Sequence, residues 1–202
     1  AMALVNLSVE QVNVEERENT ANLVKEIFEQ FQHSEDIALR YAKTLVNLSA
    51  KQVNVEERKN TANLVKKIFE QFQHSEDIAL RYAMVLFNLS KLQNERDEVG
   101  NTVKQILAIL TNLSSVKIFE IVVKIFENNP DTPLDTNDIP FTSLTKILDK
   151  LCFYSNDGFD RKLLIRALNL DLVINTKYDI LKDWIKHYKD DENKLNQLID
   201  IY

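Results

Sequence analysis

The sequence predicts an all-α fold built by stacking a repeated helical unit, and three observations favour it. The letters LVNLS at 4–8 return at 45–49 and as LFNLS at 86–90. One short stretch thus recurs every 41 residues, from 4 to 45 and from 45 to 86, and we call this interval the repeat period. Only 2 glycines and 3 prolines occur in 202 residues, which leaves few of the residues that tight hairpin turns need. The intervening apolar residues follow helical spacing. Because a unit of this size cannot bury its apolar stripes alone, we expect stacked units that form a solenoid.

The repeat is nearly perfect over its first two copies. Residues 4–44 and 45–85 align without a gap and differ at six positions. A diverged third copy covers 86–129, and we align its first helix by deleting two residues. Residues 1–3 are interpreted as a cloning remnant, and the near-identity indicates recent duplication or engineering. The six differences are Val9/Ala50, Glu10/Lys51, Glu18/Lys59, Glu26/Lys67, Lys43/Met84 and Thr44/Val85.

Each copy is expected to hold three helices. A short one is predicted over residues 12–17, with Asn19 supplying a turn and Thr20 capping the next helix. The second carries an apolar stripe of Leu23, Val24, Ile27, Phe28 and Phe31. Ser34 is the expected N-cap of the third helix, with two acidic residues in its first turn. The buried stripe of that helix is predicted to be Ile37, Ala38, Tyr41, Ala42, Leu45 and Leu48.

The charge differences between copies have two explanations. Residues 4–44 carry eight acidic and four basic side chains, net −4, whereas residues 45–85 carry five and six, net +1. Stacking would bring Glu10, Glu18 and Glu26 near Lys51, Lys59 and Lys67, which could form exposed ion pairs between copies. The alternative is neutral drift on a solvated surface.

The last third of the chain has a different character. The segment NNPDTPLDTNDIP at 128–140 holds all 3 prolines and is predicted to be a loop. Four segments with helical apolar spacing follow it. Residues 130–202 are therefore interpreted as degenerate helical repeats that cap the C-terminal end of the stack.

The repeats resemble the armadillo family, whose third helix typically ends in Ala-Trp-Ala-Leu-x-Asn-Leu-Ala. Residues 42–49, AKTLVNLS, and 83–90, AMVLFNLS, fit that frame, and the resemblance covers 4 to about 129. It implies a right-handed superhelical armadillo-like solenoid. The turn glycine of the family is missing from the first two copies. If Asn19 and Asn60 do not replace it, the first two helices of a copy would merge into a two-helix HEAT-like unit.

The resemblance also implies a site. In peptide-binding members of the family, an Asn on each third helix binds the backbone of an extended peptide in a concave groove, and the matching residues are Asn6, Asn47 and Asn88. The usual aromatic residue is replaced by Lys43 and Met84, so binding of a basic import signal is not expected.

The spacing itself indicates the same face. A polar line runs along one side of the third helix in each copy at steps of four, three and four. Copy three offers Val116, Glu120, Val123 and Glu127 in its place, so the line is expected to stop after the second copy. The alternative is that these asparagines end helices and that the charges are ordinary solvated side chains. The line consists of Asp36, Arg40, Lys43 and Asn47, and again of Asp77, Arg81, Met84 and Asn88.

Composition limits the classes of partner and the cellular compartment that we expect. A net charge of −6 argues against nucleic acid, and the sequence has no apolar run long enough to span a membrane and no signal peptide. Cys152 is the single cysteine, which favours a reducing compartment, the cytoplasm, with the nucleus as the alternative.

No catalytic or cofactor-binding arrangement stands out. His33 and His74 are merely copies of each other, and two isolated glycines, Gly100 and Gly158, cannot form a phosphate loop. We therefore expect a non-enzymatic module without cofactor or metal that binds an extended segment of a partner protein. The alternative is a structural or self-assembling arm of a larger protein. Homo-oligomers formed by repeat swapping are also left open.

Overall fold

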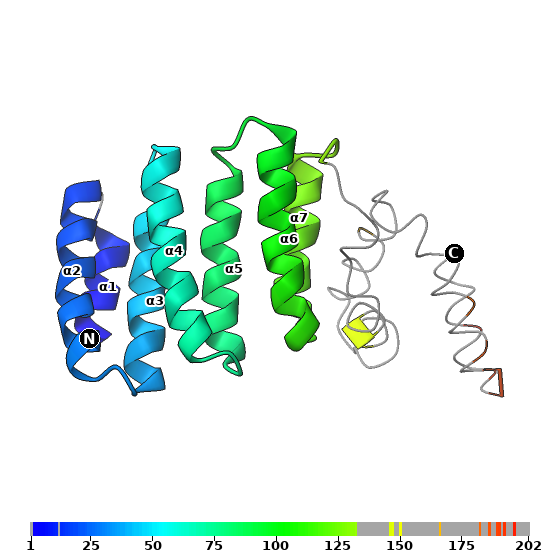
Figure 1. Ribbon diagram of the computed structural model, residues 1–202, viewed down its shortest axis with the longest axis horizontal. Helices are drawn as coiled ribbons and strands as arrows, with labels where there is room; N and C mark the ends of the chain where they lie inside the picture. Colours follow the sequence, from blue (N-terminus) through cyan, green and yellow to red (C-terminus); the bar gives the residue numbers. More distant parts are fainter. Residues whose placement is uncertain are drawn as a thin grey trace. The chain divides into compact units, whose positions relative to one another are not determined.

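The computed structural model describes residues 2–11 and 13–132, with a few isolated residues between 146 and 196. Within these residues the secondary structure is helical and contains no strand (Figure 1), which confirms the all-α prediction for this part of the chain. No helix in the described ranges is both long and apolar enough to cross a membrane. The chain divides into two compact units, Ala1–Thr102 and Val103–Tyr202.

Seven helices occupy the described ranges, and their bounds follow the repeat period. The predicted capping helices within 130–202 lie outside the described residues, apart from Pro130–Thr132 and the isolated positions. Cys152 also lies outside them. The helices are α1 (Met2–Glu10), α2 (Val14–Gln30), α3 (Glu35–Ser49), α4 (Val55–Gln71), α5 (Glu76–Ser90), α6 (Arg96–Asn112) and α7 (Val116–Asn128).

Each of the first two copies contributes two helices, so the prediction of three was wrong. The segment expected to hold a short helix, a turn and a cap is one continuous helix, α2, which passes through Asn19 and Thr20. In the second copy, α4 passes through Asn60 in the same way. No non-glycine residue in the described ranges has a positive φ, so neither asparagine adopts the left-handed turn. The first two predicted helices of each copy are therefore one continuous helix.

Side-chain caps define where the helices begin. The prediction that Ser34 caps α3 is confirmed, because its hydroxyl accepts from the amide of Ile37, and Ser75 caps α5 in the same way. The caps of α2 and α4 are Asn13 and Asn54, not the predicted Thr20. Both asparagines accept from the first turn of the helix that follows, which satisfies amides that have no partner inside the helix.

The helices pack through stripes of small and branched residues. In α3, the predicted stripe is buried at Ala38, Tyr41, Ala42, Leu45 and Leu48, and only Ile37 is partly exposed. The predicted stripe of α2 was too wide. Val24 is fully buried, whereas Leu23 and Phe31 are half exposed, at 50% and 57%. Ring pairs join the helices of each copy, with centroids 5.6 Å apart for Phe28 and Tyr41 and 5.8 Å for Phe69 and Tyr82.

Within the first unit, the helices form two layers. Helix α3 packs against both α1 and α5, and we call these three helices the α1–α3–α5 row. The other two helices, α2 and α4, each pack against the row, α2 on α1 and α3, and α4 on α3 and α5. Figure 1 shows the helices running side by side along their lengths. By the repeat period, α1 corresponds to the C-terminal part of α3 and of α5.

The helix bounds revise the alignment of the third copy. Helix α6 begins and ends one full repeat period after α4, so the predicted deletion of two residues that aligned this helix was wrong. Helix α7 begins one position short of a full period after α5, as does its cap, Ser115, relative to Ser75. A single residue is therefore missing from the third copy, and it is missing from the turn between α6 and α7.

Candidate partner-binding surface

Two of the three asparagines predicted to clamp a peptide form hydrogen bonds between neighbouring helices of the row. Asn47 on α3 donates from Nδ2 to Oγ of Ser8 on α1 at 2.9 Å. Asn88 on α5 donates in the same way to Ser49 on α3, also at 2.9 Å. Asn6 on α1 is exposed and makes no hydrogen bond within the described part of the chain. One N–H of each interior amide is thus engaged with the preceding helix.

A buried arginine, which the sequence did not single out, strengthens the same junction. Arg17 lies in the first turns of α2 and is only 5% exposed. Its guanidinium donates to three carbonyls at helix ends: Nε to Gln11 at 2.7 Å, Nη1 to Asn47 at 2.7 Å and Nη2 to Val9 at 3.1 Å. The C-terminal carbonyls of a helix lack intrahelical partners and carry partial negative charge. The arginine therefore caps α1 and binds near the end of α3 with one side chain.

The second copy repeats this clamp with Arg58, which is 7% exposed. It donates from Nε to the carbonyl of Gln52 at 2.7 Å and from Nη1 to the carbonyl of Asn88. Burial lowers the pKa of Arg17 and of Arg58 below the usual value, since each guanidinium gives up part of its hydration. The spacing of Arg17 in the sequence could have indicated its burial, because Arg17 lies two helical turns before the buried Val24 and therefore on the same face of the helix.

A threonine next to Asn19 in α2, and another next to Asn60 in α4, bonds the helix to a glutamine in the segment that precedes it. The hydroxyl of Thr20 is buried and donates to Oε1 of Gln11 at 3.0 Å. Thr61 repeats the bond with Gln52 at 3.0 Å. A third occurs in the diverged copy, from Thr102 to Gln93 at 2.9 Å. In that copy the position of the arginine is occupied by Val99, which is buried at 3% exposure.

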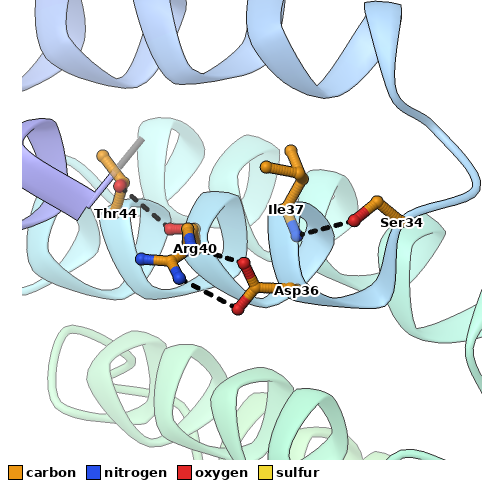
Figure 2. A network of polar contacts seen from close by, with 5 residues as sticks. All are labelled: Ser34, Asp36, Ile37, Arg40 and Thr44. Atoms are coloured by element: carbon orange, nitrogen blue, oxygen red, sulfur yellow. Dashed lines mark hydrogen bonds and ion pairs between the residues drawn. The ribbon is translucent and has the colours of Figure 1, made fainter.

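The polar line on α3 is internally paired (Figure 2). Arg40 donates from Nε to Oδ2 of Asp36 at 2.8 Å and from Nη2 to Oδ1 at 3.1 Å. These bonds, with weaker contributions from the charges of Arg40 and Lys43, hold the pKa of Asp36 below its usual value. Thr44 also donates to the carbonyl of Arg40 at 3.0 Å. In the first copy, then, the charges of Asp36 and Arg40 largely satisfy each other.

The same line on α5 is arranged differently. Arg81 donates from Nη1 to the sulfur of Met84 at 3.3 Å, a weak acceptor. Its Nε is buried and has no hydrogen-bond partner among the residues that the structure describes. Asp77, one turn earlier, is exposed and forms no ion pair within the described residues. The cation and the anion that pair in the first copy are therefore both left available in the second.

The residues that were aligned with this line in copy three are not its counterparts in the structure. With the cap of α7 at Ser115, the counterparts of the α5 line lie one position short of a full repeat period later. They are not Val116, Glu120, Val123 and Glu127, which the sequence alignment had placed opposite the line. Glu127 instead forms an ion pair with Arg166, and this bond lowers the pKa of Glu127 and raises that of Arg166. The counterparts are Lys117, Ile121, Lys124 and Asn128.

The predicted ion pairs between equivalent positions of the first two copies do not form among the described residues. Lys59 instead pairs forward, with its Nζ 3.3 Å from Oε1 of Glu98 on α6. Both side chains are partly exposed, at 40% and 35%, so the contribution of this pair to stability is about 0–1 kcal/mol. The position equivalent to Lys59 in the first copy is Glu18, which makes no ion pair in the described part of the chain.

The comparisons with known proteins add no assignment. No family model, no curated protein and no solved structure matches the chain. Among the described residues, no group of three or more His, Cys, Asp or Glu side chains is placed to hold a metal ion. The candidate surface thus consists of the polar lines of α3 and α5, and Arg81 is the member with a buried N–H that no described residue accepts.

Proposed function

We propose that this chain is a non-enzymatic protein-interaction module, built as an armadillo- or HEAT-like solenoid, that binds an extended partner segment along α3 and α5. The packing of α1, α3 and α5 in one row supports a continuous binding surface. The near-identical chemistry of two successive helices supports recognition of an elongated partner. The single cysteine and the absence of a basic surplus favour a protein partner in the cytoplasm, with the nucleus as the alternative.

The observation that carries the proposal is the state of Arg81. A buried N–H without an acceptor is costly, and such groups in native proteins call for an explanation. A thioether does not replace a carboxylate as the partner of a guanidinium. A carboxylate from a partner would accept two parallel hydrogen bonds once the side chain turns away from Met84. The partner segment is therefore expected to carry an acidic side chain at this point.

The asparagines have a smaller part in this proposal than the family resemblance implied. Asn47 and Asn88 each use one N–H to hold the preceding helix. Only the second N–H and the carbonyl oxygen of each amide remain for a bound backbone. Recognition would consequently depend more on Arg81 and Met84, with Arg40, Lys43 and Asp77 around them.

The test is selection of binders from a random peptide library displayed on phage, followed by calorimetry with the selected peptides. We expect peptides with Asp or Glu, and we expect Arg81→Gln to weaken their binding about tenfold or more, because a charge-assisted bond is lost. Arg40→Gln is the matched control and should change affinity about threefold or less, since that arginine already has an internal partner. Binding that is equally sensitive to both substitutions, or independent of both, would contradict the proposal.

The alternative function is a structural arm with no specific ligand. It would be favoured if repeated selections return no peptide that binds the folded chain while a control repeat protein yields binders under the same conditions.

A further inference from the structure

On the surface at the α1 end of the first unit, a leucine of the repeated stretch is exposed, whereas its equivalents on α3 and α5 are buried. Leu7 is 45% exposed, whereas its equivalents Leu48 and Leu89 are 6% and 5% exposed. The surrounding sequence is the same, so the difference comes from position in the stack and not from composition. Leu48 lies on α3, which has a neighbour in the row on each side, whereas α1 has only one. We call this surface the N-terminal edge and define it by Asn6, Leu7, Glu16 and Gln30.

The polar side chains of the edge make no hydrogen bond or ion pair in the described residues, whereas their equivalents elsewhere in the chain do. Asn88 and Asn47 both donate to a serine on the preceding helix of the row at 2.9 Å. Asn6 is their equivalent, since it occupies the same place in the repeated stretch, and its amide makes no bond in the described residues. A serine hydroxyl at the position that Ser49 takes against Asn88 would complete this contact.

The charge on the edge follows the same rule. Glu98 forms an ion pair with Lys59, which lies 39 residues earlier, with Oε1 of the glutamate 3.3 Å from Nζ of the lysine. Glu16 is the counterpart of Glu98, two repeat periods before it in the sequence. It is exposed and makes no ion pair within the described part of the chain. A lysine in an added unit, at the position of Lys59, would face it.

A third contact involves the turn between the helices of a copy. Gln71 at the end of α4 donates to the carbonyl of Gln32, which lies in the turn before α3, at 2.6 Å. Gln30 is the equivalent of Gln71, and its side chain is exposed and makes no hydrogen bond in the described residues. It would donate to the corresponding turn of an added unit.

We propose that the N-terminal edge is a docking surface for another helical-repeat unit with the chemistry of residues 45–85. Such a unit presents a serine to Asn6, a lysine to Glu16 and a turn carbonyl to Gln30, and it covers Leu7. It also supplies an arginine equivalent to Arg58, which reaches the carbonyl of Asn6 as Arg58 reaches that of Asn88. The docking continues the α1–α3–α5 row by one member. This interface is independent of the peptide-binding surface proposed above.

The experiment inserts a second copy of residues 45–85 between Ala3 and Leu4 of the full chain, which keeps the repeat period. Hydrogen exchange of the α1 amides is compared with that of the parent chain. We expect exchange to slow about tenfold or more, because α1 would open only together with the unit stacked on it. Unchanged exchange in α1 would overturn the proposal.

A matched insert separates specific docking from nonspecific cover. It carries Ser49→Ala and Lys59→Glu within the inserted copy only, so that the hydroxyl is removed and the lysine becomes an acid facing Glu16. We expect the protection of α1 to fall markedly, by about threefold or more. Equal protection by both inserts would overturn the assignment of these groups.

Sedimentation equilibrium of the unmodified chain and of Leu7→Glu tests a different occupant. A monomeric parent supports the proposal, because the chain's own residues 45–85 already pack against residues 4–44. A dimer that Leu7→Glu dissociates would show that the edge pairs with a second copy of the chain, which would overturn the proposed occupant.

Discussion

Asn88 on α5 and Ser49 on α3 are 39 residues apart in the sequence and are joined by a hydrogen bond of 2.9 Å. Asn47 and Ser8 are joined by the same bond at the same distance, one copy earlier. The stretch at 45–49 thus takes part in both bonds. Its asparagine donates to a serine on the preceding helix of the row, and its serine accepts from an asparagine on the following helix. These two bonds link the stretches at 4–8, 45–49 and 86–90 in series.

The asparagines of the row should differ in their effect on stability according to position. We expect Asn47→Ala to lower the free energy of unfolding by about 1 kcal/mol, because it removes a hydrogen bond to a buried serine. Asn6→Ala should change it by less than about 0.5 kcal/mol, because Asn6 is exposed and makes no bond in the described part of the chain. Urea unfolding of both variants measures the difference, and equal losses would count against the account.

Loss of the arginine clamp should cost more than loss of an asparagine. Arg58→Met leaves the carbonyls of Gln52 and Asn88 without their charged donor, and we expect a loss of about 2–3 kcal/mol. Lys66→Met on the same helix is the control. Its side chain is about half exposed, so its effect should stay within about 0.5 kcal/mol. A similar midpoint of urea unfolding for the two variants would refute the structural role of Arg58.

The buried tyrosines should make the fold sensitive to alkali. Desolvation, reinforced by Glu29 and Glu70 respectively, raises the pKa of Tyr41 and of Tyr82 to about 12. A raised pKa means that the folded state favours the neutral phenol. The stabilisation is therefore complete below the ordinary pKa of about 10 and is lost as pH rises from there to about 12.

The measurement is the ultraviolet absorbance of tyrosinate, recorded with helix content by circular dichroism. Two tyrosines should ionise only as the helices unfold, and Tyr41→Phe with Tyr82→Phe should remove that late phase. Ionisation of every tyrosine near its ordinary pKa with the helices intact would disagree with this burial.

The continuity of α4 leads to a prediction about Asn60. The residue is exposed within a helix, and alanine has the higher helix propensity. Asn60→Ala should therefore raise the free energy of unfolding by about 0.5 kcal/mol. If a left-handed turn existed there, the same substitution would destabilise the protein, so the sign of the change in a urea titration decides between one helix and two.

The sequence allowed correct prediction of the features that depend on local patterns. The caps at Ser34 and Ser75 and the buried stripe of α3 follow from residues within one or two turns of each other. The break at Asn19 was wrong because the helix is held by Arg17 and Thr20, whose partners include groups up to 30 residues away. A local pattern treats both as surface residues.

The candidate site was predictable as a set of positions but not as a set of contacts. Asp36 with Arg40 and Asp77 with Arg81 have the same spacing, yet among the described residues only the first pair forms. The nearest sequence difference is Lys43 in place of Met84, and the sulfur of Met84 takes up the guanidinium of Arg81. Whether the arginine of a copy pairs with its aspartate thus depends on the residue at the position of Lys43 or Met84. Helical spacing alone does not show this difference.

The most direct test of the link between copies is a double-mutant cycle on Asn88 and Ser49. The free energy of unfolding is measured for the parent, for Asn88→Ala, for Ser49→Ala and for the double variant. We predict a coupling energy of about 0.5–1.5 kcal/mol between the two side chains, while Asn6→Ala combined with Ser49→Ala should be additive. Additive effects of Asn88→Ala and Ser49→Ala would contradict the account, because the two residues would then stabilise the protein independently.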